Sequence, residues 1–187
     1  MNGSEVGRPL LRIARNAIGA ELGLPVESVP PDETFSRVGA TFVTLMRSGQ
    51  VRGCVGTLKA TRPLRVDVQR NAVGAAFRDP RFRPLAREEF DVTLIEVSLL
   101  TPSQPLRFAD ENELLAQLRP GIDGVTIEYG NHCATFLPQV WQTLPEPRRF
   151  LAELKRKAGL PLELWRAELN VSRYQVTKWK ESELFPV

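Results

Sequence analysis

Histidine and cysteine are scarce in this chain, which holds one histidine and two cysteines among its 187 residues. A structural zinc site needs about four such ligands at characteristic spacings, and His132, Cys54 and Cys133 do not form such a pattern. The phosphate-loop motif G-x-x-x-x-G-K-[ST] is also missing. We therefore expect neither a metal nor a cofactor, although ligation by carboxylates alone stays open.

Long apolar runs are missing as well. The chain contains no apolar stretch near the roughly 20 residues that a membrane-spanning helix needs. The first residues, Met1 to Glu5, lack the apolar core of a secretory signal. We therefore expect a cytoplasmic protein without a membrane partner, in which both thiols are reduced. A disulfide between Cys54 and Cys133 is the alternative.

The net charge is small, because 25 basic residues face 22 acidic ones and leave +3. This argues against nucleic acid as the main partner, since dedicated binders carry a clear basic excess. The charge is uneven, however: the stretch from Lys59 to Arg87 is strongly basic. Such a stretch is typical of a solvated helix face, and the alternatives are attraction of an anionic substrate or of RNA.

The composition is that of a globular domain, with 42% hydrophobic and 25% charged residues. Helices and strands are interspersed, and several strands pair through short turns. We therefore predict a compact, two-lobed α+β fold, with an antiparallel or mixed sheet and flanking helices, over a single domain of residues 1–187. Apolar spacing predicts helices at 10–22, 63–78, 110–119 (capped by Asp110) and 147–158 (ended by Gly159), and strands at 41–47, 51–58, 92–100, 124–129, 133–137 and 171–179.

The most informative segment is Val51–Gly56, where a thiol lies between two glycines. Glycine weakens a strand, so its presence suggests that something approaches the backbone closely. Side chains alternate along a strand, so the two valines should face the core while Arg52 and Cys54 share the other face, roughly 7 Å apart. A guanidinium that close favours the thiolate. The segment predicts a nucleophilic or substrate-binding cysteine, and the alternative is that Cys54 only fills space.

These considerations give a set of candidate site residues. Cys54 and Arg52 are the catalytic candidates. The candidates for substrate binding are the neighbouring Gly53, Gly56 and Thr57, together with Thr135, a polar position in a later strand.

A nucleophilic cysteine usually needs a base. His132, the one histidine, is predicted to lie at the turn of the second hairpin. Asp123, Glu128 and Lys157 are the other candidates for proton transfer.

Taken together, several segments resemble the AMMECR (AMME chromosomal region) domain family, and specifically its bacterial branch, AmmeMemoRadiSam system protein A. They occur in the family's order and run nearly from end to end of the chain. The segments are 51–57 (VRGCVGT), 71–77 (NAVGAAF), 79–85 (DPRFRPL), 95–100 (IEVSLL), 134–141 (ATFLPQVW) and 150–160 (FLAELKRKAGL).

The resemblance implies a two-lobed α+β domain in which segment 51–57, suspected in the family to be a catalytic or substrate-binding site, lies at or near a groove. It also implies association with a Memo-like protein and a radical S-adenosylmethionine protein, but brings no established reaction. Asp123 stands where many members have histidine, so a base at this position would be a carboxylate here. We therefore predict a component of a modification system, acting on a small molecule or a macromolecule. The alternative is a non-catalytic module that binds protein or RNA.

Overall fold

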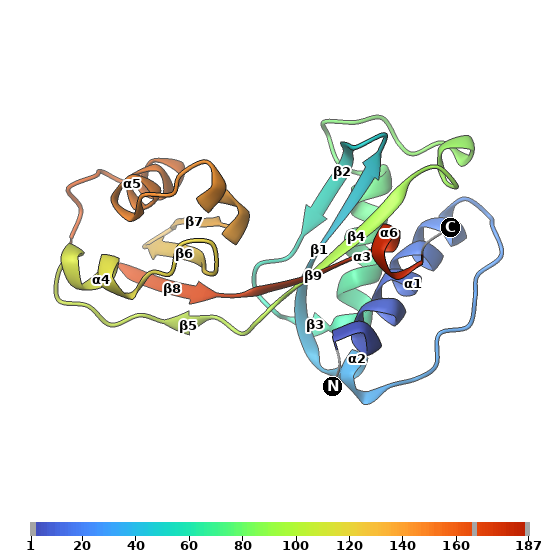
Figure 1. Cartoon of the computed structure of the whole chain (residues 1–187), viewed down its shortest axis with the longest axis horizontal. Coiled ribbons are helices and arrows are strands. Elements are labelled where there is room, and N and C mark those ends of the chain that lie inside the picture. Colours follow the sequence, from blue (N-terminus) through green and yellow to red (C-terminus); the bar gives the residue numbers. More distant parts are fainter. Residues whose placement is uncertain (1–2, 166–167, 186–187) are drawn as a thin grey trace. The chain divides into compact units, whose positions relative to one another are not determined.

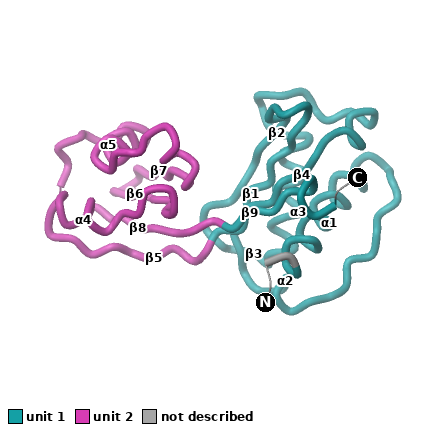
Figure 2. The backbone as a smooth tube through the Cα atoms, viewed as in Figure 1, with its two compact units in different colours: residues 1–100, 177–187 teal, residues 101–176 magenta. Residues whose placement is uncertain are grey.

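The computed structural model describes residues 3–165 and 168–185 (Figure 1). The chain forms two compact units (Figure 2). Unit 1 holds the described residues up to Leu100 and those from Thr177 onward, and unit 2 holds those from Thr101 to Val176. Each unit has its own sheet and its own apolar core. The predicted α+β class is confirmed.

The sheet of unit 1 has the strand order β2-β1-β4-β9, so β2 is an edge strand. Its central element is β1, a ten-residue strand that pairs antiparallel with β2, β4 and the short β3. The bounds are β1 (Val38–Arg47), β2 (Gln50–Gly56), β3 (Arg62–Pro63), β4 (Leu94–Leu100) and β9 (Val176–Lys180).

Two long helices, α1 (Gly3–Glu21) and α3 (Leu64–Phe77), pack against each other and against the strands of unit 1 (Figure 1). They bury alternate strand residues, Val43 and Leu45 from β1 and Val97 from β4 among them, in one apolar core. The residues between these, such as Thr44, point to the other face of the sheet and are partly exposed. Short helices complete the unit: α2 (Glu33–Ser36), the 3₁₀ turn η1 (Arg87–Glu89) and α6 (Glu181–Leu184).

The sheet of unit 2 has the strand order β5-β8-β6-β7, with antiparallel pairing throughout. Its core includes the indole of Trp141 stacked on the ring of Phe150, with 3.7 Å between the ring centroids. The Asp110 side chain caps α4 as predicted, by accepting from the backbone N–H of Glu113 at 2.9 Å. The bounds are β5 (Gln104–Pro105), α4 (Glu111–Gln117), β6 (Gly124–Tyr129), β7 (His132–Phe136), η2 (Pro138–Gln142), α5 (Pro147–Lys157) and β8 (Asn170–Tyr174).

The prediction of one closing strand over 171–179 is wrong. The chain instead forms β8 in the sheet of unit 2 and β9 in the sheet of unit 1. Between them, the backbone of Gln175 bonds to Thr101, donating to its hydroxyl and accepting from its N–H, both at 2.9 Å. An apolar alternation shows that a segment is extended, but it does not show which neighbour each half pairs with.

Helix α3 and strand β2 approach each other closely in unit 1. A side-chain Cβ at Gly53 would lie 2.1 Å from the carbonyl oxygen of Ala75, which is too close for any residue but glycine. On the same interface, a Cβ at Gly74 would lie 3.0 Å from the Val55 side chain. Glycine at position 53 is therefore what lets the strand approach the helix backbone.

We predict that Gly53→Ala lowers the free energy of unfolding by about 1–3 kcal/mol or more, because the helix carbonyl cannot move without shifting α3. The measurement is urea denaturation followed by circular dichroism. Gly19→Ala is the matched control: it lies within α1, and its Cβ would meet its nearest neighbour, the Phe90 ring, at an ordinary 3.4 Å. The control should be neutral or stabilising by up to about 1 kcal/mol, and equal stabilities of the two variants would refute the packing argument.

Candidate functional site on the edge strand

Cys54 lies on β2 directly opposite Thr44 of β1, and the Thr44 hydroxyl donates to its Sγ at 3.3 Å. The thiol is partly exposed. Cys133, the other thiol, is exposed and belongs to unit 2.

A β-bulge precedes Cys54. Val51 pairs with Met46, and Gly53 pairs with Leu45, the residue before Met46, so Arg52 is the extra residue of the bulge. The bulge interrupts the alternation of side chains: Val51 is exposed, whereas Val55 packs against the core. The expectation that both valines face the core is therefore correct for Val55 and wrong for Val51.

The two glycines beside Cys54 have a packing cause. Gly53 makes room for the helix carbonyl described above, and a Cβ at Gly56 would lie 2.2 Å from the ring of Phe42, its partner on β1. Something does approach the backbone closely, as the sequence suggests, but it belongs to the chain itself. Substrate contact by Gly53 or Gly56 stays a prediction.

The backbone of Cys54 is held by an acid–arginine pair, which we call the edge clamp and define as Asp79 and Arg81. The N–H of Cys54 donates to Asp79 Oδ2 at 2.9 Å, and Arg81 Nη2 lies 3.4 Å from the carbonyl oxygen of Cys54. Within the clamp, Arg81 Nε donates to Asp79 Oδ1 at 2.9 Å and Nη2 to Oδ2 at 2.7 Å. The clamp thus gives Cys54 the two bonds that a neighbouring strand would supply.

The electrostatics of the clamp follow from these bonds. The hydrogen bonds from Arg81 hold the pKa of the buried Asp79 well below its usual range. In return, the bonds to Asp79 raise the pKa of Arg81, with a smaller contribution from the charge interaction with Cys54. Arg81 is therefore a permanent cation that contacts the backbone of Cys54. No local pattern in the sequence indicates that this residue reaches Cys54.

Arg52 is engaged by a different carboxylate. Its Nε and Nη2 donate to the two carboxylate oxygens of Glu89 at 3.0 and 2.9 Å, and Arg47 also bonds to Glu89. The hydrogen bonds from Arg52, together with one from the backbone N–H of Ala86, lower the pKa of Glu89 to about 2. The charge of Arg52 is thus directed at Glu89, and a catalytic role for Arg52 stays a prediction.

Thr57, another predicted substrate contact, belongs to a buried polar network between β1, β2 and α3. Its hydroxyl accepts from Asn71 Nδ2 at 3.2 Å. The same nitrogen lies 3.0 Å from a carboxylate oxygen of Asp67, which is fully buried and also accepts from the N–H and hydroxyl of Thr41. Arg62 Nε completes the network 3.1 Å from the other carboxylate oxygen. The network joins the end of β2 to α3.

Thr135 lies in unit 2, on β7, and is buried. Its hydroxyl donates to the carbonyl of Val125 at 2.9 Å and lies 2.8 Å from the Tyr174 hydroxyl. Burial raises the pKa of Tyr174, so the pair is a neutral hydrogen-bonded contact across the sheet. Substrate binding by Thr135 stays a prediction.

The predicted proton-transfer residues all belong to unit 2 and all have partners there. His132 Nδ1 lies 2.9 Å from the carbonyl of Ala158, so Nδ1 carries the proton that is donated. Asp123 is fully buried and accepts from Arg119, with 2.6 Å between Oδ1 and Nη2. The remaining two residues are engaged as well: Glu128 lies 3.7 Å from the Cys133 thiol, and Lys157 donates to the Thr135 carbonyl at 3.0 Å.

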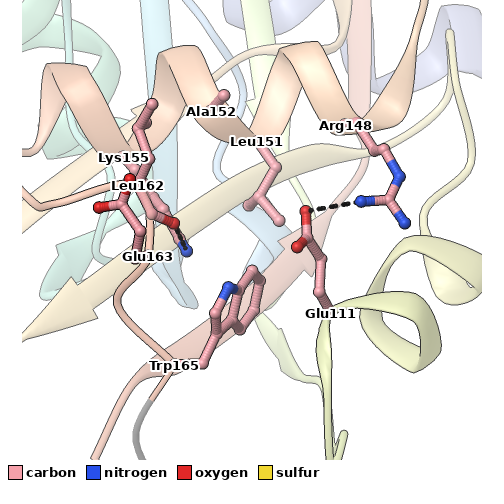
Figure 3. A pocket seen from close by; sticks show the side chains of 8 residues that line it. All are labelled: Glu111, Arg148, Leu151, Ala152, Lys155, Leu162, Glu163 and Trp165. Carbon is pink, nitrogen blue, oxygen red and sulfur yellow. Dashed lines mark hydrogen bonds and ion pairs between the residues drawn. The ribbon is translucent and has the colours of Figure 1, made fainter.

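Unit 2 also contains a cavity of about 400 Å³ beside α5 (Figure 3). Lys155 in its wall is buried, and its Nζ donates to the carbonyls of Leu162 and Leu164 at 2.7 and 2.9 Å. The same ammonium group lies 3.5 Å from the centre of the Trp165 ring. Burial lowers the pKa of Lys155. With these acceptors satisfied, Lys155 ties the turn at 162–165 to the helix.

The described residues were also compared with the requirements of a metal site and of a membrane-spanning helix. Within 3–165 and 168–185, no group of three or more histidine, cysteine or carboxylate side chains is placed to hold a metal ion. In the same described ranges, no helix has the length and apolar character needed to cross a membrane.

The fold and the site define an α+β protein with a glycine-flanked thiol on a clamped edge strand. The AMMECR1 family model matches residues 11–179 of the chain. Protein MJ0810 of Methanocaldococcus jannaschii is 35% identical over 190 residues, covering 96% of this chain and 92% of that protein. A protein of Aeropyrum pernix is 37% identical, over 95% of this chain and 79% of that protein.

A solved structure agrees with the sequence relatives. The crystal structure of the uncharacterized protein PH0010 from Pyrococcus horikoshii superposes with a TM-score of 0.80 at 32% sequence identity, covering 94% of this chain and 91% of that one. The chain therefore belongs to the AMMECR1 family, as the sequence motifs predict.

We predict that Glu89→Gln destabilises the protein by about 2–3 kcal/mol at neutral pH, because Arg52 loses a bidentate carboxylate partner. The folded-state pKa of Glu89 is lowered from 4.5 to about 2. Its stabilisation is therefore complete above about pH 4.5 and disappears as the pH falls to about 2. Urea titrations at several pH values should show the difference between wild type and variant shrinking over this window. Glu88→Gln, at an exposed neighbour, should change stability by less than about 0.5 kcal/mol at every pH, and a pH-independent effect of Glu89→Gln would contradict the assignment.

Proposed function

We propose that this AMMECR1 protein acts through its Arg52–Gly56 segment, with Cys54 as the group that binds or attacks the substrate. The observation that carries the proposal is that a partly exposed thiol lies on an edge strand whose backbone is fixed by the edge clamp. A reactive group needs such support, because a site that is loosely held loses its geometry.

The surroundings of the sulfur support a chemical role. The Thr44 hydroxyl donates to Sγ, and the Arg81 guanidinium interacts electrostatically with Cys54. Both are groups that stabilise negative charge on a sulfur atom. We therefore propose that Arg81, in addition to Arg52, stabilises negative charge on the sulfur. The guanidinium of Arg52 is paired with Glu89.

We predict that Arg81→Gln slows alkylation of Cys54 by iodoacetamide about threefold to tenfold at neutral pH, because the positive charge that interacts with Cys54 is lost. A Cys133→Ser background makes Cys54 the one thiol that reports. Arg81→Lys, which keeps the charge, should recover part of the rate, and Arg70→Gln, at an exposed position on α3, should leave it unchanged. Equal rates in all four proteins would remove the electrostatic role of Arg81.

We further propose that the protein works in a cytoplasmic modification system with a Memo-like protein and a radical S-adenosylmethionine protein, on a small-molecule or macromolecular substrate. The support is the resemblance of its motifs, segment 51–57 foremost, to the bacterial branch of the family. The second candidate is a non-catalytic binding module. It is favoured by the proton-transfer residues of unit 2, each of which is already engaged by another group.

Co-expression separates these candidates. With the Memo-like and radical S-adenosylmethionine proteins of the same genome, we expect co-elution on size-exclusion chromatography and a change of mass in a component or substrate. Cys54→Ser should keep the complex and abolish the mass change if Cys54 is a nucleophile. A complex that forms without any Cys54-dependent product would favour the binding module. The absence of both complex and product would refute the proposed system, and the exposed change Arg149→Gln is the control for nonspecific loss.

A further inference from the structure

The segment from Arg78 to Arg87 carries more positive charge than its own contacts neutralise. Three of its arginines, Arg78, Arg83 and Arg87, are exposed. Within residues 3–165 and 168–185, these three side chains form no hydrogen bond and no ion pair. Arg81, in contrast, is held by Asp79. The segment therefore combines a fixed arginine with several that are available to a ligand.

This segment runs along the edge strand that bears Cys54. Arg81 reaches the carbonyl of Cys54, and Arg52 Nη2 lies 3.5 Å from the carbonyl of Pro84. The ring of Phe82 lies close to both guanidiniums, with its centre 5.9 Å from the Cζ of Arg52 and 5.4 Å from that of Arg81. Arg83 stands between Phe82 and Pro84, so its backbone is held beside the strand.

Arg87 lies at the C-terminal end of this segment, close in sequence to a residue that binds Arg52. It is the first residue of η1, whose last residue, Glu89, binds Arg52 with both carboxylate oxygens. Arg83 and Arg87 thus lie on one short chain segment, between the edge clamp and the carboxylate partner of Arg52. An anion that reaches this segment would meet a local excess of positive charge.

Arg52 itself has unused donor capacity. Its Nη1 is shielded from solvent and has no hydrogen-bond partner among the described residues, although Nε and Nη2 are both bonded. A buried donor on a charged group is costly when it lacks an acceptor. An oxygen atom of a ligand would supply one if the side chains that cover Nη1 move aside when the ligand binds.

We propose that the Cys54 site takes a small anionic ligand, bearing phosphate or carboxylate groups, which Arg83 and Arg87 hold and whose oxygen reaches Arg52. The inference rests on the proposed function of the Cys54 segment. Guanidinium groups bind both kinds of anion through paired, charge-assisted hydrogen bonds. The ligand's anionic end would then lie beside the clamp, with the rest of the molecule directed to the thiol.

The same observations speak against RNA as the ligand. Single-stranded RNA is bound by exposed aromatic rings on which bases stack, along an extended basic groove. Phe82 is half-buried and already lies against two guanidiniums, and the chain as a whole carries a net charge of only +3. The available charge is confined to one short segment, which suits a compact anion.

Isothermal titration calorimetry on the full chain tests the proposal, with pyrophosphate and citrate as probes and a 12-nucleotide oligouridylate as the RNA arm. We expect one of the small anions to bind, and Arg83→Gln/Arg87→Gln to weaken it at least about tenfold. The control Arg107→Gln/Arg149→Gln removes the same charge from exposed positions of unit 2 and should change the affinity less than about twofold. The probe that binds identifies the anion as phosphate-like or carboxylate-like.

Three outcomes would overturn the inference: no binding of either small anion, an equal loss in both double variants, or oligouridylate binding that is tighter than small-anion binding and falls steeply with salt. The alkylation assay separates this failure from failure of the proposed function. If Arg81→Gln slows alkylation of Cys54 while no anion binds, the thiol site stands and its anionic ligand does not. If an anion binds through Arg83 and Arg87 and also protects Cys54 from iodoacetamide, the two are linked as proposed.

Discussion

One carboxylate sets the geometry of the Cys54 edge. Asp79 is buried and accepts from the backbone N–H of Cys54, while Arg81 holds it and reaches the carbonyl of the same residue. An unpaired strand edge invites pairing with another chain, and here an acid–arginine pair occupies it at the position of the thiol. The arrangement leaves the thiol partly exposed while its backbone is fixed, and it places an ion pair against the backbone of Cys54 without a separate structural element.

The sequence predicted this fold well where the signals are local. The helices at α3, α4 and α5, the two hairpins and the cap by Asp110 all rest on spacing or on turn residues a few positions apart. The edge clamp could not be predicted from local signals, because Asp79 lies 25 residues after Cys54, the residue whose backbone N–H donates to it. The segment around Pro80 is recognisable as irregular, but nothing local shows that it folds back on β2. The motif 79–85 pointed to this segment only through resemblance to the family.

The candidate site illustrates a second limit. The two glycines next to Cys54 were correctly interpreted as points of close approach, yet the approaching groups are the Ala75 carbonyl and the Phe42 ring. Similarly, the alternation rule placed Arg52 beside the thiol, and a bulge at that residue lets its guanidinium pair with Glu89. Both cases have one origin, since a sequence shows that space or charge is needed at a position and does not show which group uses it.

The order of the strands along the chain has a consequence for biosynthesis. Unit 1 begins near the N-terminus, is interrupted after Leu100, and resumes only at Thr177. Its strand β9, which lies beside β4 and contributes the buried Trp179 to the core, follows the whole of unit 2 in sequence. During synthesis on the ribosome, β4 therefore lacks its partner strand β9 until about 75 further residues have been made. Unit 2, whose residues are continuous, is free to fold in that interval, so the later unit in sequence can be completed before the earlier one.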